Sequence, residues 1–147
     1  QGFITVEYLA ASLLDMDFHT MKSIPANLNV MDYEQKVLGK RKILKQIPSR
    51  YRTTYFNHTM GGGYTAGYYS YIWAEVLDCD AFGAYTESGD IFNQDLAAKF
   101  RKYILEPGGI DDAMDMYKNF RGKAPEIKWL LNNRGLEPKT DLKKKKE

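Results

Sequence analysis

The fold is decided by the stretch HTMGGGYTAGYYSYIWAEVLD, which occupies residues 58–78. Its three consecutive glycines, Gly61, Gly62 and Gly63, cost backbone entropy and bury no side chain. They indicate a loop that flexes or lies against a ligand, and a plain flexible turn is the alternative. The apolar residues that follow recur at helical spacing, which predicts one long helix from about Tyr64 to Thr86.

This predicted helix has two different faces. Tyr64, Tyr68, Tyr71 and Glu75 are four, three and four residues apart, which places them on one side. A phenol stays protonated at neutral pH and donates hydrogen bonds well, so this side can orient a peptide backbone or stabilise an oxyanion. Ordinary packing with the hydroxyls in water is the alternative. The expected core side carries Tyr69, Ile72, Trp73, Val76 and Leu77.

The rest of the chain also has helical periodicity, interrupted by glycine and proline. Apolar spacing and stop signals predict further helices over about 4–19, 32–46, 93–105, 112–120 and 125–133. Asp32 is expected to begin the second of these, and Asp111 or Asp112 the fourth, which Gly122 should end. Because no alternating strand of useful length occurs, the predicted class is all-α.

Composition excludes several kinds of protein. The 147 residues are 44% hydrophobic and 27% charged, as in one globular domain. No apolar run approaches the length of a membrane span, so no membrane partner is expected. The net charge of +2 arises from the run Lys143–Lys146, which argues against a basic face for nucleic acid.

The cysteine content and the N-terminus suggest where the protein resides. The single cysteine, Cys79, cannot form an intramolecular disulfide, and we expect it to be a small packing residue in a reducing, cytoplasmic compartment. The chain begins at Gln1 without an initiator Met or a basic leader, so we expect a segment of a longer protein that has no signal peptide.

Common catalytic and metal-binding motifs do not occur in the sequence. The two histidines, His19 and His58, are 39 residues apart, and there is no H-E-x-x-H or Cys/His cluster, so this segment is predicted to bind no metal. Neither G-x-x-x-x-G-K-[ST] nor G-x-S-x-G is present. His19 is expected to cap its helix or lie at the surface.

One resemblance covers almost the whole chain. Residues 56–78 are similar to the signature that follows the zinc site in thimet-oligopeptidase-type zinc metallopeptidases. The spacing from His58 to Tyr64 and the triple glycine resemble the peptidyl-dipeptidase (dipeptidyl carboxypeptidase) branch more than the oligopeptidase branch. The similarity spans about residues 2–136. Within this range, other matching segments are 5–11, 14–17, 120–125 and 134–136.

This resemblance implies an incomplete enzyme. Residues 1–136 would be the helical C-terminal segment of the elongated catalytic domain, and 137–147 a polar, disordered tail. In the family, an upstream H-E-x-x-H helix and an upstream Glu hold the zinc. Zinc is therefore expected in the full-length enzyme and not in this segment, which alone should be inactive. The implied partners are short peptides, cleaved to release C-terminal dipeptides, and the upstream part of the domain. With that part missing, we expect the segment to self-associate.

The resemblance also assigns roles to individual residues. In the family, the equivalent of Tyr71 donates its hydroxyl to the oxyanion, and the equivalents of His58 and Tyr64 hold the substrate backbone and assist that charge. The catalytic candidates are thus His58 and Tyr71, and the substrate-binding candidates are Tyr64, Tyr68 and the loop Gly61–Gly63. A helical peptide-binding module without catalysis and a purely structural fragment are the alternatives.

Overall fold

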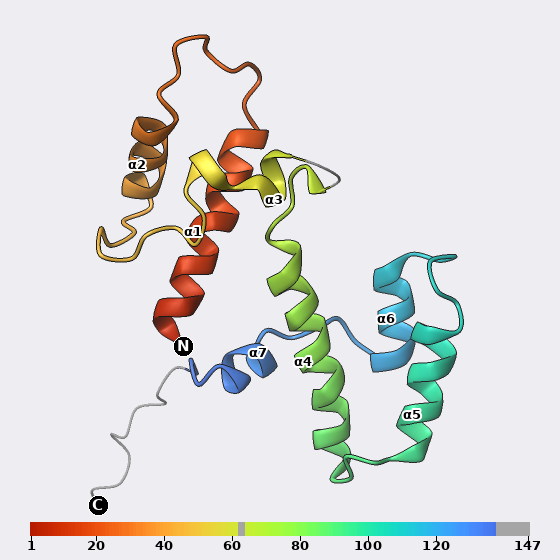
Figure 1. The fold of residues 1–147 in the computed structure, drawn as a ribbon. Helices are drawn as coiled ribbons and strands as arrows, with labels where there is room; N and C mark the ends of the chain where they lie inside the picture. The colour runs from red at the N-terminus through yellow and green to blue at the C-terminus, as the bar shows by residue number, and fades with distance from the viewer. Residues whose placement is uncertain (62–63, 138–147) are drawn as a thin grey trace, which may run out of the picture. The chain divides into compact units, whose positions relative to one another are not determined.

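The computed structural model describes residues 1–61 and 64–137 and contains helices but no strand within these ranges (Figure 1). The all-α prediction is therefore confirmed. The elements are α1 (Gly2–His19), α2 (Val30–Lys40), η1 (Thr53–Tyr55), α3 (Asn57–Met60), α4 (Ser70–Ser88), α5 (Gln94–Phe100), η3 (Arg101–Leu105), α6 (Ala113–Arg121) and α7 (Lys128–Asn133). The chain divides into two compact units, residues 1–72 and residues 73 onward. Within the described ranges, no helix is both long enough and apolar enough to cross a membrane.

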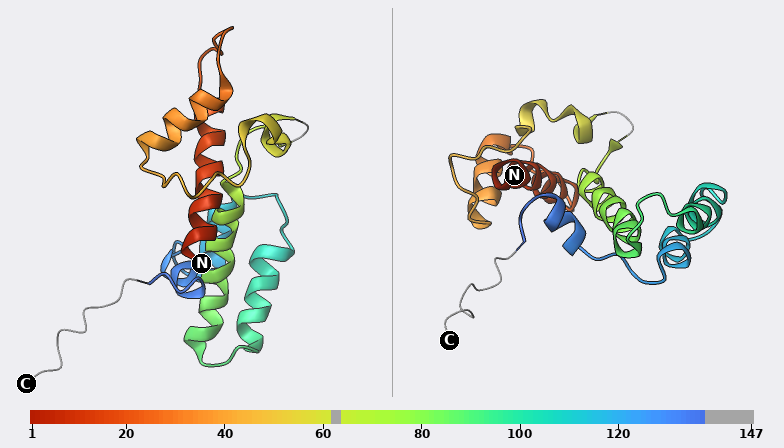
Figure 2. Two further views of the ribbon diagram at one scale, coloured as in Figure 1. Left: turned by 60° about the vertical axis from the view of Figure 1, so that its left-hand side comes forward. Right: turned by 90° about the horizontal axis from the view of Figure 1, so that it is seen from below.

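The first unit is built on α1, which packs against α2 (Figures 1 and 2). Asn29 begins α2, because its side-chain oxygen accepts hydrogen bonds from the backbone N–H groups of Met31 and Asp32. Beyond the other end of α2, Arg41 forms a two-pronged ion pair with Asp17 of α1, at 2.6 and 2.8 Å. Such paired contacts to one guanidinium fix geometry as well as charge.

The core of the first unit is aromatic. Ala11, Phe56 and Tyr68 are buried, and Tyr8 and Tyr51 pack against them. Phe56 stacks on Tyr51 at a centroid distance of 5.0 Å and meets the edge of Tyr68 at 5.2 Å. The segment 51–68, which precedes α4, is thus packed against α1 through its aromatic rings.

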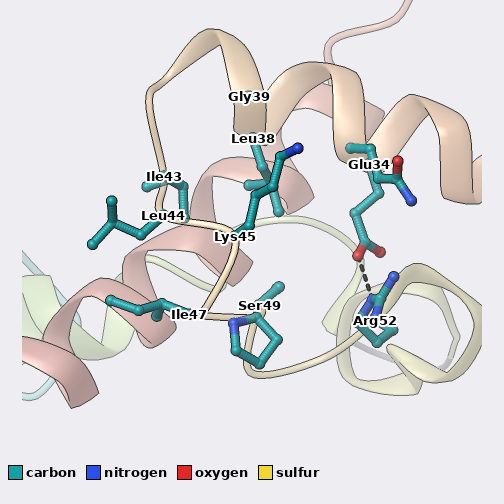
Figure 3. Close-up of a pocket in the computed structure, with 11 residues that line it drawn as sticks. Glu34, Leu38, Gly39, Ile43, Leu44, Lys45, Ile47, Ser49 and Arg52 are labelled. Carbon is teal, nitrogen blue, oxygen red and sulfur yellow. Dashed lines mark hydrogen bonds and ion pairs between the residues drawn. The ribbon is translucent and has the colours of Figure 1, made fainter.

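A buried acid joins α2 to η1. Glu34 is only 3% exposed, and its carboxylate accepts hydrogen bonds from the N–H and hydroxyl of Thr53, both at 2.9 Å. It also forms an ion pair with Arg52 (Figure 3). Glu34 and Arg52 border a pocket of about 570 Å³. Its apolar side is formed by Leu38, Ile43, Leu44, Ile47 and Pro48.

The second unit has its core between α4 and α6. Ala81 and Ala84 on α4 and Tyr117 and Phe120 on α6 are buried together. Helix α5 continues without interruption into the π-helix η3, and both lie alongside α6 (Figures 1 and 2). Asp112 begins α6 by accepting hydrogen bonds from two backbone N–H groups, and Gly122 ends it in the left-handed conformation with a φ of 79°.

The second unit also contains a buried ionic network around Asp80, which has no exposed surface. Its carboxylate accepts hydrogen bonds from the Tyr117 hydroxyl at 2.6 Å and from Arg121 Nε at 3.0 Å. Arg121 in turn donates to Glu87 at 2.8 Å. Burial, together with the neighbouring Asp80 carboxylate, raises the pKa of Tyr117 far above its ordinary value. This network joins α4 to α6.

Three predicted helices have the expected bounds, and the other three differ. The helices over 4–19, 93–105 and 112–120 agree with α1, with α5 plus η3, and with α6. Helix α2 begins after Asn29 rather than at Asp32, and it ends at Lys40 because Lys42 takes a left-handed φ of 57°. Helix α7 begins at Lys128 rather than near residue 125, and the N–H of Glu126 in the segment before it donates to Asp80.

The long helix differs most from its prediction. It begins at Ser70 rather than at Tyr64 and ends at Ser88. The preceding residues cannot be helical, since Ala66 and Gly67 have φ values of 61° and 100°. Tyr64 and Tyr68 therefore do not lie on a face of this helix. The expected core side is also partly wrong: Val76 is buried, but Tyr69 and Trp73 are 50% and 46% exposed.

Candidate functional site: a histidine–tyrosine cluster

His58 lies on α3, a single helical turn, and its direction follows from its neighbours. Phe56 and Thr59 are each only 1% exposed and face the core of the first unit. At about 100° per residue, His58 is then directed to the opposite side of this turn. The imidazole is half-buried and is surrounded by tyrosine rings.

Three tyrosines surround this imidazole. The ring of Tyr64 stacks on His58 with centroids 4.9 Å apart. The ring of Tyr68 meets it edge-on at 5.3 Å, and that of Tyr71 lies at 5.6 Å. We call these four residues the histidine–tyrosine cluster. All four belong to the first unit.

The cluster contains one polar contact between side chains. The hydroxyl of Tyr71 lies 3.1 Å from Nε2 of His58, within hydrogen-bond distance. The phenol donates when Nε2 carries no proton, and it accepts when Nε2 is protonated. This contact joins the Tyr71 hydroxyl to the imidazole of His58.

Exposure distinguishes the three tyrosines. Tyr64 and Tyr71 are 66% and 50% exposed, so their hydroxyls are available to a bound molecule. Tyr68 is only 6% exposed, and burial raises the pKa of its phenol. Tyr68 is therefore the buried member of the cluster. Its predicted contact with substrate stays a prediction.

The glycine loop lies next to the cluster in the chain. Gly61 directly follows α3, and a Cβ atom at this position would lie 2.6 Å from the side-chain oxygen of Asn57. This oxygen is the end of the exposed side chain of Asn57, so a side chain at position 61 would require only that Asn57 move. Gly62 and Gly63, also predicted to bind substrate, lie outside the described residues, as do residues 138–147 of the predicted tail.

The sequence interpretation missed two residues of α1 that contact the segment between the loop and α4. The Asp15 carboxylate accepts hydrogen bonds from the N–H groups of Gly67 and Tyr68, at 2.8 and 2.9 Å. The hydroxyl of Tyr8 donates to the backbone carbonyl of Tyr68. The sequence contained one signal of this contact: Asp15 is an acid at a core position, one residue after the buried Leu14.

The remaining sequence candidates lie away from the cluster. Nδ1 of His19 is 2.9 Å from the backbone oxygen of Asp15, one turn earlier on α1, which agrees with the expected capping role. Cys79 is half-buried, and burial and the nearby acids raise the pKa of its thiol. Within the described part of the chain, no three His, Cys, Asp or Glu side chains are grouped so that they could hold a metal ion.

The cluster can donate hydrogen bonds to a peptide. Exposed phenols beside an imidazole are neutral donors, and such donors bind carbonyl oxygens and stabilise charge that develops on them. The arrangement is thus a group of partly exposed hydrogen-bond donors on a helical segment.

Comparison with known proteins identifies the family. The sequence pattern of Peptidase family M3 matches residues 1–136. This chain belongs to peptidase family M3.

Its relatives include peptidases from bacteria and yeast. The chain is 39% identical over 137 residues to dipeptidyl carboxypeptidase of Escherichia coli K12, a match that covers 92% of this chain and 20% of the relative. It is 36% identical over 118 residues to oligopeptidase A of Haemophilus influenzae, covering 80% and 17%. Saccharolysin of Saccharomyces cerevisiae is 31% identical over 140 residues, covering 92% and 19%. The chain thus spans about a fifth of the length of these relatives.

Proposed function

We propose that the chain is the C-terminal part of the catalytic domain of a zinc metallopeptidase that releases dipeptides from the C-termini of short peptides. The match to peptidase family M3 over residues 1–136 supports a peptidase. The peptidyl-dipeptidase activity rests on the spacing from His58 to Tyr64 and on the relative named dipeptidyl carboxypeptidase. A cytoplasmic location is proposed from the single cysteine.

The role that we assign to this chain is to donate hydrogen bonds to the reacting peptide. Tyr71 donates its hydroxyl to the oxyanion that forms when the scissile carbonyl is attacked, and His58 orients that hydroxyl. Tyr64 binds the substrate backbone. The observation that carries this proposal is the 3.1 Å contact between a half-exposed Tyr71 hydroxyl and His58 Nε2. A donor held in place before the reaction stabilises the transition state without a cost of reorganisation.

Within the described ranges, no three His, Cys, Asp or Glu side chains are grouped so that they could hold a metal ion. We propose that the zinc of the whole enzyme is held by residues outside this chain, and that the segment alone is inactive. We also propose that the segment binds the upstream part of its domain. In the absence of that part, it self-associates through exposed apolar side chains such as Phe92 and Ile110, which are 76% and 80% exposed.

The decisive experiment is Tyr71→Phe in the whole enzyme. The change removes one hydroxyl and keeps the ring, so the packing of the cluster is retained. Loss of one oxyanion donor costs about 3 kcal/mol, so kcat should fall about a hundredfold while KM changes little. Steady-state kinetics on a short peptide measure both constants.

Two further variants complete the test. Tyr64→Phe should change KM at least as strongly as kcat, because we propose that Tyr64 binds the substrate backbone. Tyr69→Phe is the matched control, since Tyr69 is exposed and lies outside the cluster, and its kinetics should equal wild type. If the Tyr71→Phe enzyme turns over peptide at the wild-type rate, Tyr71 is not an oxyanion donor, and a non-catalytic peptide-binding surface becomes the better description.

A further inference from the structure

Asp15 has an unusual position for a charged residue. It lies on α1 between apolar positions and has no exposed surface. A carboxylate without solvent requires hydrogen-bond donors. Its Oδ2 finds two, the N–H groups of Gly67 and Tyr68, at 2.8 and 2.9 Å. These donors lie 52 and 53 residues further along the chain.

The backbone of these two donors has an uncommon conformation. Ala66 and Gly67 both have positive φ values, 61° and 100°. Glycine adopts such a φ freely, but alanine does so only where its surroundings require it. Successive N–H groups in a turn of this kind converge on one anion. Here the anion is the Asp15 carboxylate, which therefore explains why Ala66 takes this conformation.

The carbonyl of the next peptide group is also held by α1. The hydroxyl of Tyr8 donates to the carbonyl of Tyr68, and the two rings lie 4.9 Å apart. Both the N–H and the carbonyl of Tyr68 are thus bound to side chains of α1. The Ser70 N–H donates to the Gly67 carbonyl at 2.9 Å, which begins α4 directly after this point.

We propose that Asp15, with Tyr8, is a positioning residue for the histidine–tyrosine cluster. It fixes the segment 67–70 and thereby the Tyr68 ring, which lies 5.3 Å from His58 and 5.7 Å from Tyr71. It also fixes the start of α4, and hence where the Tyr71 hydroxyl lies relative to His58. Its effect on catalysis rests on the function proposed above for Tyr71.

The first test does not depend on activity. The 147-residue chain is labelled with ¹⁵N-histidine, and the His58 imidazole nitrogens are followed by NMR in wild type, Asp15→Asn and Asp17→Asn. Asp15→Asn removes the charge that holds two N–H groups, so the Nε2 shift of His58 should move toward that of Tyr71→Phe. Asp17→Asn is the matched control on the same helix, since Asp17 pairs with Arg41, and it should leave His58 unchanged. An unchanged His58 signal in folded Asp15→Asn would overturn the positioning role.

The second test is a double-mutant cycle in the whole enzyme. A displacement of about 1 Å can cost up to a hundredfold in rate, so Asp15→Asn should lower kcat at least about tenfold. If Asp15 acts through Tyr71, adding Asp15→Asn to Tyr71→Phe should lower kcat little further. Fully additive losses would overturn the proposal. If Tyr71→Phe alone has no effect on kcat, the proposed function fails, and the NMR result still decides the positioning role.

A second variant guards against misfolding. If Asp15→Asn does not fold, Tyr8→Phe removes only the hydroxyl that binds the Tyr68 carbonyl and keeps the packed ring. This variant should shift His58 in the same direction and lower kcat, with circular dichroism unchanged. Wild-type His58 shifts and kcat in Tyr8→Phe would show that α1 does not position the cluster.

Discussion

Gly83 allows a sharp test of the packing in the second unit. It lies in the middle of α4, where glycine is a poor residue, and it faces Trp129 of α7. A Cβ atom added at Gly83 would lie 2.4, 2.6 and 2.7 Å from Cε2, Cδ2 and Nε1 of the indole. These distances are below the 3.0 Å that real Cβ atoms respect. Gly83→Ala must therefore displace the ring of Trp129.

Two opposing effects set the size of the change. Alanine is favoured over glycine in a helix interior by about 1 kcal/mol. Overpacking at a closely packed site costs about 1–3 kcal/mol, and a rigid indole at 2.4 Å places Gly83 toward the upper end. We expect Gly83→Ala to lower the free energy of unfolding by about 1–2 kcal/mol.

The measurement is urea unfolding of the chain, followed by circular dichroism and by tryptophan fluorescence from Trp73 and Trp129. Gly39→Ala on α2 is the matched control, because nothing lies within 4 Å of the added Cβ atom there. It should leave stability unchanged or raise it by up to about 1 kcal/mol. A Gly83→Ala chain at least as stable as wild type, with unchanged fluorescence, would refute the contact between α4 and α7.

Two further predictions concern charges of the second unit. Asp80→Ala leaves Arg121, whose side chain is 6% exposed, with Glu87 as the ion-pair partner that remains among those described. The change should lower the unfolding free energy by about 3 kcal/mol; urea unfolding checks this, and a change below about 0.5 kcal/mol would contradict it. Hydrogen bonds from Lys123, the larger effect, and from Lys128 lower the pKa of Glu126 from 4.5 to about 2. Its stabilising contribution should thus be present above pH 4.5 and be lost as the pH falls toward 2. An NMR titration of Glu126 should show a midpoint near 2 that rises with added salt, and an ordinary midpoint would exclude the ion pairs.

Local signals in the sequence were sufficient for much of the fold. The prediction of α6 rested on Asp111 or Asp112 at its start and Gly122 at its end, and Asp112 and Gly122 take those positions in the structure. Helix α1 followed from apolar spacing alone. For α6, the residues that start and stop the helix lie at its ends, so a single sequence contains the signal.

Contacts between distant residues could not be predicted in the same way. The helix expected from Tyr64 actually begins at Ser70, because Asp15, far away in the chain, binds the N–H groups that this helix would need. The segment before α7 is likewise bound to a distant residue, through the N–H of Glu126 and the carboxylate of Asp80. Helical periodicity carries no information about such partners.

The tyrosines of the cluster show how a correct grouping can follow from an incorrect reason. Tyr64, Tyr68 and Tyr71 were expected together because they would share one helix face. Only Tyr71 lies on α4, yet all three rings lie around His58. The left-handed turn at Ala66 and Gly67 separates Tyr64 from the other two, and the ring of Tyr64 nevertheless stacks on His58. The spacing correctly indicated that the three tyrosines lie close together. They do so around His58, and not by sharing one face of a helix.

The bond between Asp15 and residues 67 and 68 has a consequence for the order of folding. During synthesis, α1 emerges more than 50 residues before the donors that satisfy its buried carboxylate. Until then, the carboxylate has a local contact at Oδ1, 2.9 Å from Nδ1 of His19, but Oδ2 lacks its two donors and must be solvated by water, so the apolar side of α1 cannot be fully sequestered from water. The docking of α1 and the ordering of the turn before α4 therefore form one cooperative event. A nascent chain that ends before residue 67 would hold α1 in a loosely packed state, in which it is accessible to chaperones and proteases.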